Sequence, residues 1–170
     1  MGPEHNKGRS LLIWKDYFPN ATITGVDIRP DAKSVETDRV TVEIGDISSL
    51  DFLSKIATTY NSNKIVIDDA SHRWSHQVLA FEKLFSTVEE GGIFIMEDIQ
   101  TSFAPLNEKG YADCYEDAYS YFSKLAYLVC GNGKKHTFFD SHHPTPMQMA
   151  LAKTIDSISI YHATILVVKK

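Results

Sequence analysis

The sequence contains few cysteines and no long apolar run. Its 170 residues include two cysteines, Cys114 and Cys130, and neither belongs to a Cys-X-X-Cys pair or a Cys/His zinc spacing. We therefore expect two buried free thiols, and neither a disulfide framework nor a zinc site. The longest apolar runs, such as residues 93–96 and 165–168, are as short as strands. Because a membrane-spanning helix needs about 20 apolar residues, we expect no membrane span.

A block of basic residues is also lacking. Seventeen Lys and Arg stand against 22 Asp and Glu, which gives a formal net charge of -5. Without a basic stripe to follow a phosphate backbone, nucleic acid is not an expected partner. The first eight residues lack the apolar core of a secretory signal, so we expect a cytoplasmic protein. The length and the 43% hydrophobic content predict one globular domain over residues 1–170.

Apolar periodicity predicts an α/β fold. Helical and strand-like segments alternate, as in βα units around a mostly parallel, Rossmann-like sheet. The expected helices cover residues 9–18, 50–60, 74–88 and 112–129, and the expected parallel strands cover residues 22–28, 40–44, 64–69 and 93–97. The run at residues 64–69 has no polar alternation, which predicts a strand at the centre of the sheet. Residues 157–161 and 164–168 are so close in sequence that they predict an antiparallel hairpin.

Acidic residues end each expected parallel strand. In an open parallel sheet, ligands bind outside the carboxyl ends of the strands, so these acids are candidate ligand-binding residues. The set comprises Asp27, Asp46, Asp68, Asp69, Glu97 and Asp98. Asp27 stands where nucleotide-binding folds use an acid to hold ribose hydroxyls, and Asp46 would lie nearby, facing the base. The alternative for both is a helix cap or a turn, which Asp also favours.

Asp69, Glu97 and Asp98 predict a metal site. They end two strands that should be neighbours about 4.8 Å apart, so their carboxylates can converge on one point. Three converging carboxylates repel one another and need a compensating cation, and an all-oxygen ligand set suits Mg²⁺. The alternative is that they are solvated loop acids or helix caps.

His72 is the candidate general base. It follows Asp69 by three residues at the start of an expected helix, which places its imidazole at the same edge of the sheet. An imidazole with a pKa near ~6.5 can take a proton from a hydroxyl that a metal has made more acidic. A capping or packing contact at the helix start is the alternative.

Two motifs resemble a known family. The sequence reads Ile-Asp-Asp-Ala-Ser-His at residues 67–72 and Glu-Asp-Ile-Gln-Thr-Ser at residues 97–102, with His76-Gln77 and Gly91-Gly92 between them. This block resembles the macrolide-sugar O-methyltransferases of the mycinamicin type and the related cephalosporin hydroxylase-like proteins. The resemblance implies the class I methyltransferase fold, with S-adenosylmethionine and Mg²⁺ as cofactors.

The resemblance also implies roles for individual residues. Asp69, Glu97 and Asp98 would bind the metal and His72 would be the base. The cofactor would be bound by Asp27 at the ribose, by Asp46 at the adenine, by Asp68, and by a glycine-rich turn that includes Gly2 and Gly8 near its methionine part.

The start of the sequence departs from the family pattern. The family's first strand, at the centre of the sheet, should precede Gly2, so we expect an N-terminally incomplete domain that lacks this strand, or else a rearranged sheet. The predicted activity is methyl transfer to a hydroxyl of a sugar or natural-product small molecule. A non-catalytic binding domain and an NAD-linked enzyme are the alternatives, and an incomplete sheet would favour homo-oligomers.

Overall fold

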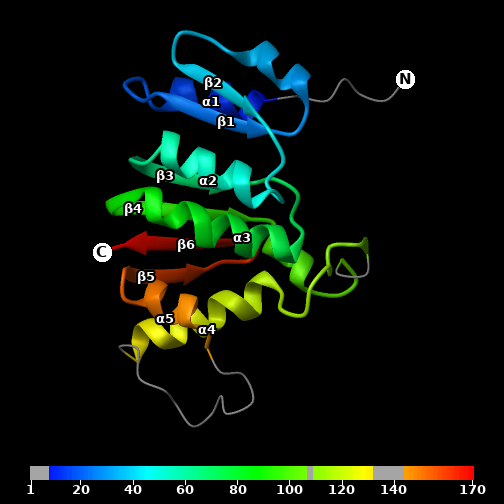
Figure 1. Ribbon diagram of the computed structural model, residues 1–170, viewed down its shortest axis with the longest axis vertical. Helices are drawn as coiled ribbons and strands as arrows, with labels where there is room; N and C mark the ends of the chain where they lie inside the picture. Colours follow the sequence, from blue (N-terminus) through cyan, green and yellow to red (C-terminus); the bar gives the residue numbers. More distant parts are fainter. Residues whose placement is uncertain (1–7, 107–108, 132–143) are drawn as a thin grey trace. The chain divides into compact units, whose positions relative to one another are not determined.

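The computed structural model describes residues 8–106, 109–131 and 144–170 (Figure 1). The chain forms two compact units, Met1–Ile47 and Ser48–Lys170. Each unit contains strands packed with helices, which confirms the α/β class. Among the described residues, every helix is too short or too polar to cross a membrane.

The first unit is built around a pair of parallel strands. Its elements are α1 (Arg9–Tyr17), β1 (Ile23–Asp27), η1 (Pro30–Val35) and β2 (Val40–Ile44). β1 and β2 pair in parallel, with Asp27 opposite Ile44. The helix α1 packs so closely on β1 that a Cβ atom on Gly25 would lie 2.4 Å from a methyl group of Leu11. Glycine at this position therefore lets the helix approach the strand.

The second unit contains a mixed four-stranded sheet. Its elements are α2 (Leu50–Thr59), β3 (Asn63–Asp68), α3 (Trp74–Leu84), η2 (Phe85–Thr87), β4 (Val88–Glu97), η3 (Ile99–Ser102), α4 (Ala118–Cys130), α5 (Pro146–Ala152), β5 (Ile155–Ile160) and β6 (Thr164–Lys169). The strand order is β3-β4-β6-β5; β3 and β4 run parallel, and β6 is antiparallel to both of its neighbours. The expected hairpin is confirmed. The expected central position of β3 is wrong for this sheet, since β3 forms its edge and Ile65 is 38% exposed.

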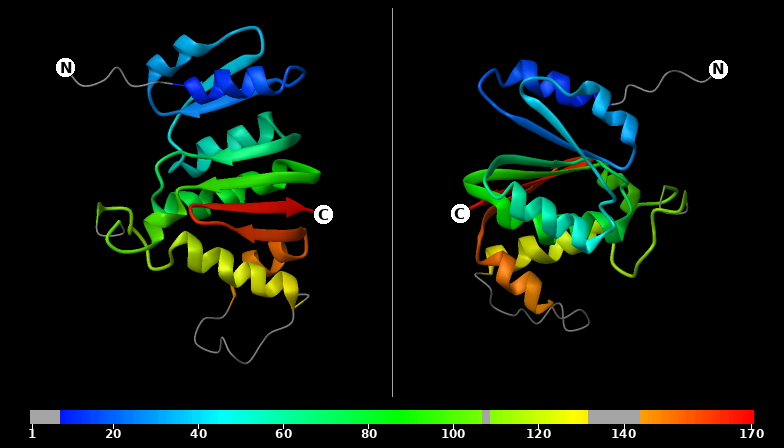
Figure 2. Two further views of the ribbon diagram at one scale, coloured as in Figure 1. Left: turned by 180° about the vertical axis from the view of Figure 1, so that it is seen from behind. Right: turned by 45° about the horizontal axis from the view of Figure 1, so that its top comes forward.

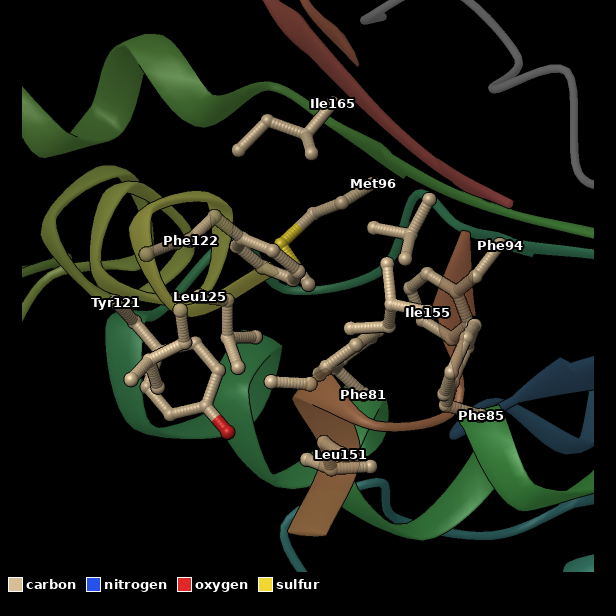
Figure 3. Close-up of a cluster of buried hydrophobic side chains, with 14 of the residues drawn as sticks. Phe81, Phe85, Phe94, Met96, Tyr121, Phe122, Leu125, Leu151, Ile155 and Ile165 are labelled. Carbon is tan, nitrogen blue, oxygen red and sulfur yellow. The ribbon is translucent and has the colours of Figure 1, made fainter. Parts of the chain in front are cut away.

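The core of the second unit lies between the sheet and the helices α3 and α4. Phe81 of α3 is fully buried, and its ring lies 4.7 to 5.1 Å from the rings of Phe85, Phe94 and Phe122 (Figure 3). Phe94 and Met96 of β4 enter this core because alternate residues of a strand face the same side. Figure 2 shows from two further sides that α4 (yellow) lies beside α5 (orange), and α4 also packs against β5.

Three expected features differ from the structure. β4 begins at Val88, which pairs with Asn63, and not at Ile93 as expected. The next pair is Ile65 with Ile93, so residues 89–92 form a bulge. Gly91 has φ 71° in this bulge, a conformation that favours glycine. The helix α4 begins at Ala118, where Asp117 accepts a capping hydrogen bond from the Ser120 amide, so Cys114 lies outside it. Both cysteines are free but exposed, so their expected burial is wrong.

Two isoleucines of β5 test where the core lies. Ile155 is fully buried and Ile160 is 40% exposed. We expect Ile155→Ala to lower the free energy of unfolding by about 2 to 5 kcal/mol, because it deletes buried methyl groups and leaves a cavity. Ile160→Ala in the same strand is the matched control and should cost less than about 1 kcal/mol. Urea denaturation of both variants measures the difference; equal costs would contradict the described packing.

Candidate metal and cofactor site

The parallel pairing of β3 with β4 brings acidic residues to one edge of the sheet. The ladder ends at Asp68 opposite Met96, and the chain continues from there into Asp69 and into Glu97-Asp98. Beyond these strand ends, Asp69, His72 and Asp98 each offer one ligand atom within 4.8 Å of the others. The structure thus brings Asp69, Asp98 and the imidazole of His72 together, whereas Glu97, which was expected to converge with the two aspartates, is not part of this group.

The imidazole of His72 lies between the two carboxylates. Its Nε2 atom is 3.3 Å from Oδ2 of Asp98 and 3.9 Å from Oδ1 of Asp69. The other oxygen of Asp98 accepts a hydrogen bond of 2.7 Å from the Gln100 side-chain amide. Gln100 thus orients the Asp98 carboxylate so that its second oxygen faces His72. Both carboxylates are partly exposed, so the cluster lies at the surface, where a ligand can reach it.

Glu97 interacts electrostatically with this cluster but lies outside its tight group. Burial raises the pKa of Glu97, and the negative charges of Asp69 and Asp98 raise it further. Burial also raises the pKa of Asp69, while His72 opposes this shift and Asp98 adds to it. The charges of His72 and Asp98 therefore act on the ionisation of both Asp69 and Glu97. The metal-ligand roles of Asp69, Glu97 and Asp98 and the base role of His72 remain predictions.

Asp68 is a buried acid with an unsatisfied oxygen. Its side chain is in the last position of β3 and the residue is 8% exposed. Within the described part of the chain, its Oδ2 atom has no hydrogen-bond partner. Burial raises its pKa to about 7, and the neighbouring charge of Asp69 contributes in the same direction. A buried acceptor without a donor is a place where a ligand's donor group fits.

The other expected cofactor residues belong to the first unit or lie outside the described residues. Asp27 ends β1, and its Oδ1 atom accepts a hydrogen bond of 2.8 Å from the Arg29 amide, as in a turn. Asp46 is exposed and follows β2. Gly8 precedes α1 with φ 66°, and a Cβ atom there would lie 2.7 Å from a methyl group of Val35. Gly2 lies outside the described residues. Their cofactor roles remain predictions.

Sequence reasoning missed the polar residues that surround the cluster. Gln77, expected to lie on a helix face, is 1% exposed and donates a hydrogen bond from Nε2 to the Glu97 carbonyl. Thr101 is 3% exposed, and its hydroxyl contacts the carbonyls of His72 and Asp98. One signal was available: Gln77 shares the apolar face of its helix with Phe81 and Leu84 at three- and four-residue steps. No comparable pattern marks Thr101.

Comparisons with known proteins support the resemblance, although no family model matches the chain. The 8-demethyl-8-alpha-L-rhamnosyl tetracenomycin-C 2'-O-methyltransferase of Streptomyces olivaceus is 32% identical over 163 residues, which cover 96% of this chain and 41% of that protein. The mycinamicin VI 2''-O-methyltransferase of Micromonospora griseorubida is 40% identical over 98 residues, or 58% of this chain and 24% of that protein.

Solved structures give the same result. The MycE methyltransferase from the mycinamycin biosynthetic pathway, in complex with Mg, SAH and mycinamycin VI, superimposes with a TM-score of 0.78 and 28% identity. The match covers 99% of this chain and 42% of that chain. The chain thus spans about two fifths of the length of this structure and of the tetracenomycin relative. The chain is therefore similar in sequence to these O-methyltransferases over part of their length and shares the fold of the matching part of MycE.

Proposed function

We propose that this chain supplies the metal- and cofactor-binding part of an S-adenosylmethionine-dependent, metal-assisted O-methyltransferase. Its substrate would be a hydroxyl of a sugar or another natural-product small molecule. The cluster of Asp69, His72 and Asp98 at the carboxyl ends of parallel strands carries the proposal, because it combines oxygen ligands with a candidate base. The sugar O-methyltransferase relatives support the reaction class.

The side chains at this edge fit a divalent cation. Asp69, Glu97 and Asp98 would hold it, since hard cations such as Mg²⁺ prefer carboxylate oxygens. The raised pKa values of Asp69 and Glu97 reflect burial and mutual repulsion, and a cation in the cluster would relieve that repulsion. When bound, Mg²⁺ would lower the pKa of an acceptor hydroxyl and S-adenosylmethionine would provide the methyl group.

His72 would take the proton from the acceptor hydroxyl. Its Nε2 atom lies 3.3 Å from Asp98 and 3.9 Å from Asp69, so a substrate oxygen held beside these carboxylates would be close to the imidazole. The negative charge of these carboxylates would stabilise the imidazolium that proton transfer creates. Gln100 fixes the Asp98 carboxylate, and Asp98 would orient the imidazole of His72. The imidazole would then need to move less when the proton is transferred.

The cofactor roles that the sequence predicts are proposed for each residue by itself. The unsatisfied Oδ2 atom of Asp68 would accept a hydrogen bond from a donor group of the cofactor. Asp27 would hold the ribose hydroxyls and Asp46 would lie against the adenine. Gly2 and Gly8 would belong to the turn beside the methionine part. A single methyltransferase-like domain over residues 1–170 and a cytoplasmic location are proposed with it.

Binding and turnover separate the alternatives. Calorimetry with S-adenosylhomocysteine and Mg²⁺ should show binding of both, and methyl transfer from labelled S-adenosylmethionine should be tested on mycinamycin VI. Binding of neither ligand would favour a non-catalytic domain. Binding of NADH in place of S-adenosylhomocysteine would favour an NAD-linked enzyme, although the relatives named above are methyltransferases.

Removing one carboxylate should weaken metal binding. We expect Asp69→Asn to lower the Mn²⁺ affinity of the chain at least about tenfold, because it removes a charge and an oxygen ligand. Asp156→Asn, the same exchange at an exposed position in β5, is the control and should leave the affinity unchanged. Mn²⁺ paramagnetic resonance measures free and bound ion. An unchanged affinity in Asp69→Asn would exclude Asp69 as a ligand.

A substitution of His72 distinguishes a base from a ligand. If His72 is the base, His72→Ala should reduce turnover at least about a hundredfold, the range for general base catalysis, and leave Mn²⁺ affinity within about threefold. The ring nitrogen that groups with the two carboxylates is absent from this variant. A tenfold or larger loss of Mn²⁺ affinity would assign His72 to the metal and require another base.

The raised pKa of Asp68 predicts a pH-dependent stability. A carboxyl group whose pKa is higher in the folded than in the unfolded state binds more protons when folded, so stability falls as pH rises. The loss of stability that ionisation of Asp68 causes is absent below pH 3.8, the ordinary pKa of the group, and complete above about pH 7. It amounts to about 4 kcal/mol at 1.36 kcal/mol per pKa unit.

Asp68→Asn should remove this dependence, since the amide does not ionise. The difference between the free energies of unfolding of the variant and the natural chain should therefore increase, in favour of the variant, by up to about 4 kcal/mol between about pH 4 and about pH 8. Urea denaturation of the metal-free chain at both pH values measures it. A difference that stays constant with pH would show that Asp68 ionises normally.

A further inference from the structure

The two residues that meet at the cluster both have unusual backbone conformations. His72 and Asp98 have φ 56°, and they are the two non-glycine residues with positive φ in the described part of the chain. L-residues enter this left-handed region rarely, and surrounding contacts must hold them there. The direction of both side chains therefore depends on whatever fixes the backbone at these two positions.

Thr101 contacts the backbone of both residues. Its hydroxyl oxygen lies 3.1 Å from the carbonyl oxygen of His72 and 3.0 Å from that of Asp98. One hydroxyl proton serves two acceptors, as in a three-centre hydrogen bond. The amide of Thr101 also donates to the Asp98 carbonyl at 3.2 Å. Because Thr101 is 3% exposed, water cannot readily replace these bonds.

Thr101 also connects the turn that follows β3 with the turn that follows β4, beyond the last pair of residues that joins these strands. The ladder between β3 and β4 ends at Asp68 and Met96, four residues before His72 and two before Asp98. Beyond it, the carbonyl of Thr101 accepts a hydrogen bond of 3.1 Å from the Trp74 indole at the start of α3. Through Thr101, the turn after β4 is thus hydrogen-bonded both to His72 and to α3, the helix that follows His72.

We infer that Thr101 is a positioning residue that holds His72 and Asp98 in their left-handed conformations and so sets the geometry of the cation cluster. This inference rests on the proposed function, because it assigns Thr101 to the same cluster. Thr101 would not touch the cation. Its hydroxyl would act on the backbone of two residues whose side chains form the site, as outer groups commonly do around metals.

Valine and serine substitutions separate the hydroxyl from the methyl group. Thr101→Val keeps the shape and deletes the hydroxyl, so Mn²⁺ affinity of the full chain, measured by calorimetry, should fall about tenfold or more. Thr101→Ser keeps the hydroxyl and should stay within about threefold of the natural chain. A Thr101→Val variant that binds like the natural chain would overturn the inference, as would a Thr101→Ser variant that loses as much.

Thr87→Val is the matched control. Thr87 is also buried, and its hydroxyl donates to the Leu84 carbonyl at 2.7 Å, at the opposite end of β4. This variant should lose stability while its Mn²⁺ affinity remains that of the natural chain. An equal loss of Mn²⁺ affinity in Thr87→Val would show that general destabilisation, and not positioning, explains the effect of Thr101→Val.

A measurement without metal keeps the inference independent of the metal assignment. Backbone chemical shifts of His72 and Asp98 report their φ angles, and in the metal-free chain they should change in Thr101→Val and persist in Thr101→Ser. If the natural chain bound no Mn²⁺, the metal part of the proposed function would fail, while these shifts would still decide the role of Thr101. Unchanged shifts in Thr101→Val would overturn it.

Discussion

The candidate site depends on the parallel register of β3 and β4. This register places Asp68 opposite Met96 and carries both strands to the same edge of the sheet. Packing enforces it, because Phe94 and Met96 must face the core that Phe81 occupies. A slip of one residue would turn these side chains to the other face of the sheet and displace the acids that follow. The same apolar contacts that stabilise the second unit therefore determine which carboxylates meet.

Exposure and burial divide the acids of this edge into two chemical types. Asp69 and Asp98 are partly exposed, so water can solvate charges that stand close together. Asp68 is buried, and its pKa of about 7 leaves a large fraction of it protonated at neutral pH. This edge of the sheet thus provides partly exposed carboxyl groups toward the surface and, inside, a buried carboxyl group whose pKa is raised. A cation and a cofactor donor would need these two different environments.

The helix α3 links the core to the site. Phe81 lies in the centre of the core, whereas Trp74, two turns earlier, and Gln77, one turn earlier, donate hydrogen bonds to the backbone carbonyls of Thr101 and Glu97. A rigid helix anchored by aromatic packing can hold such bonds in a narrow range of positions. This arrangement is typical of sites whose ligands are supported by a second layer of polar groups. The turns that carry His72 and Asp98 are accordingly held from the interior of the protein.

The sequence by itself determined the order of the strands and of the four longest helices, the final hairpin and the acids at strand ends, because these follow from local periodicity and composition, whereas it did not predict α5. Only the tertiary structure decided that Asp69, His72 and Asp98 form the tight group, that β3 is the edge of its sheet and that Thr101 contacts two turns. The physical reason is that side-chain direction depends on backbone angles. At His72 and Asp98 those angles are left-handed, and the Thr101 hydroxyl that contacts both carbonyls lies 29 residues from His72 in the chain, a separation that no local pattern records.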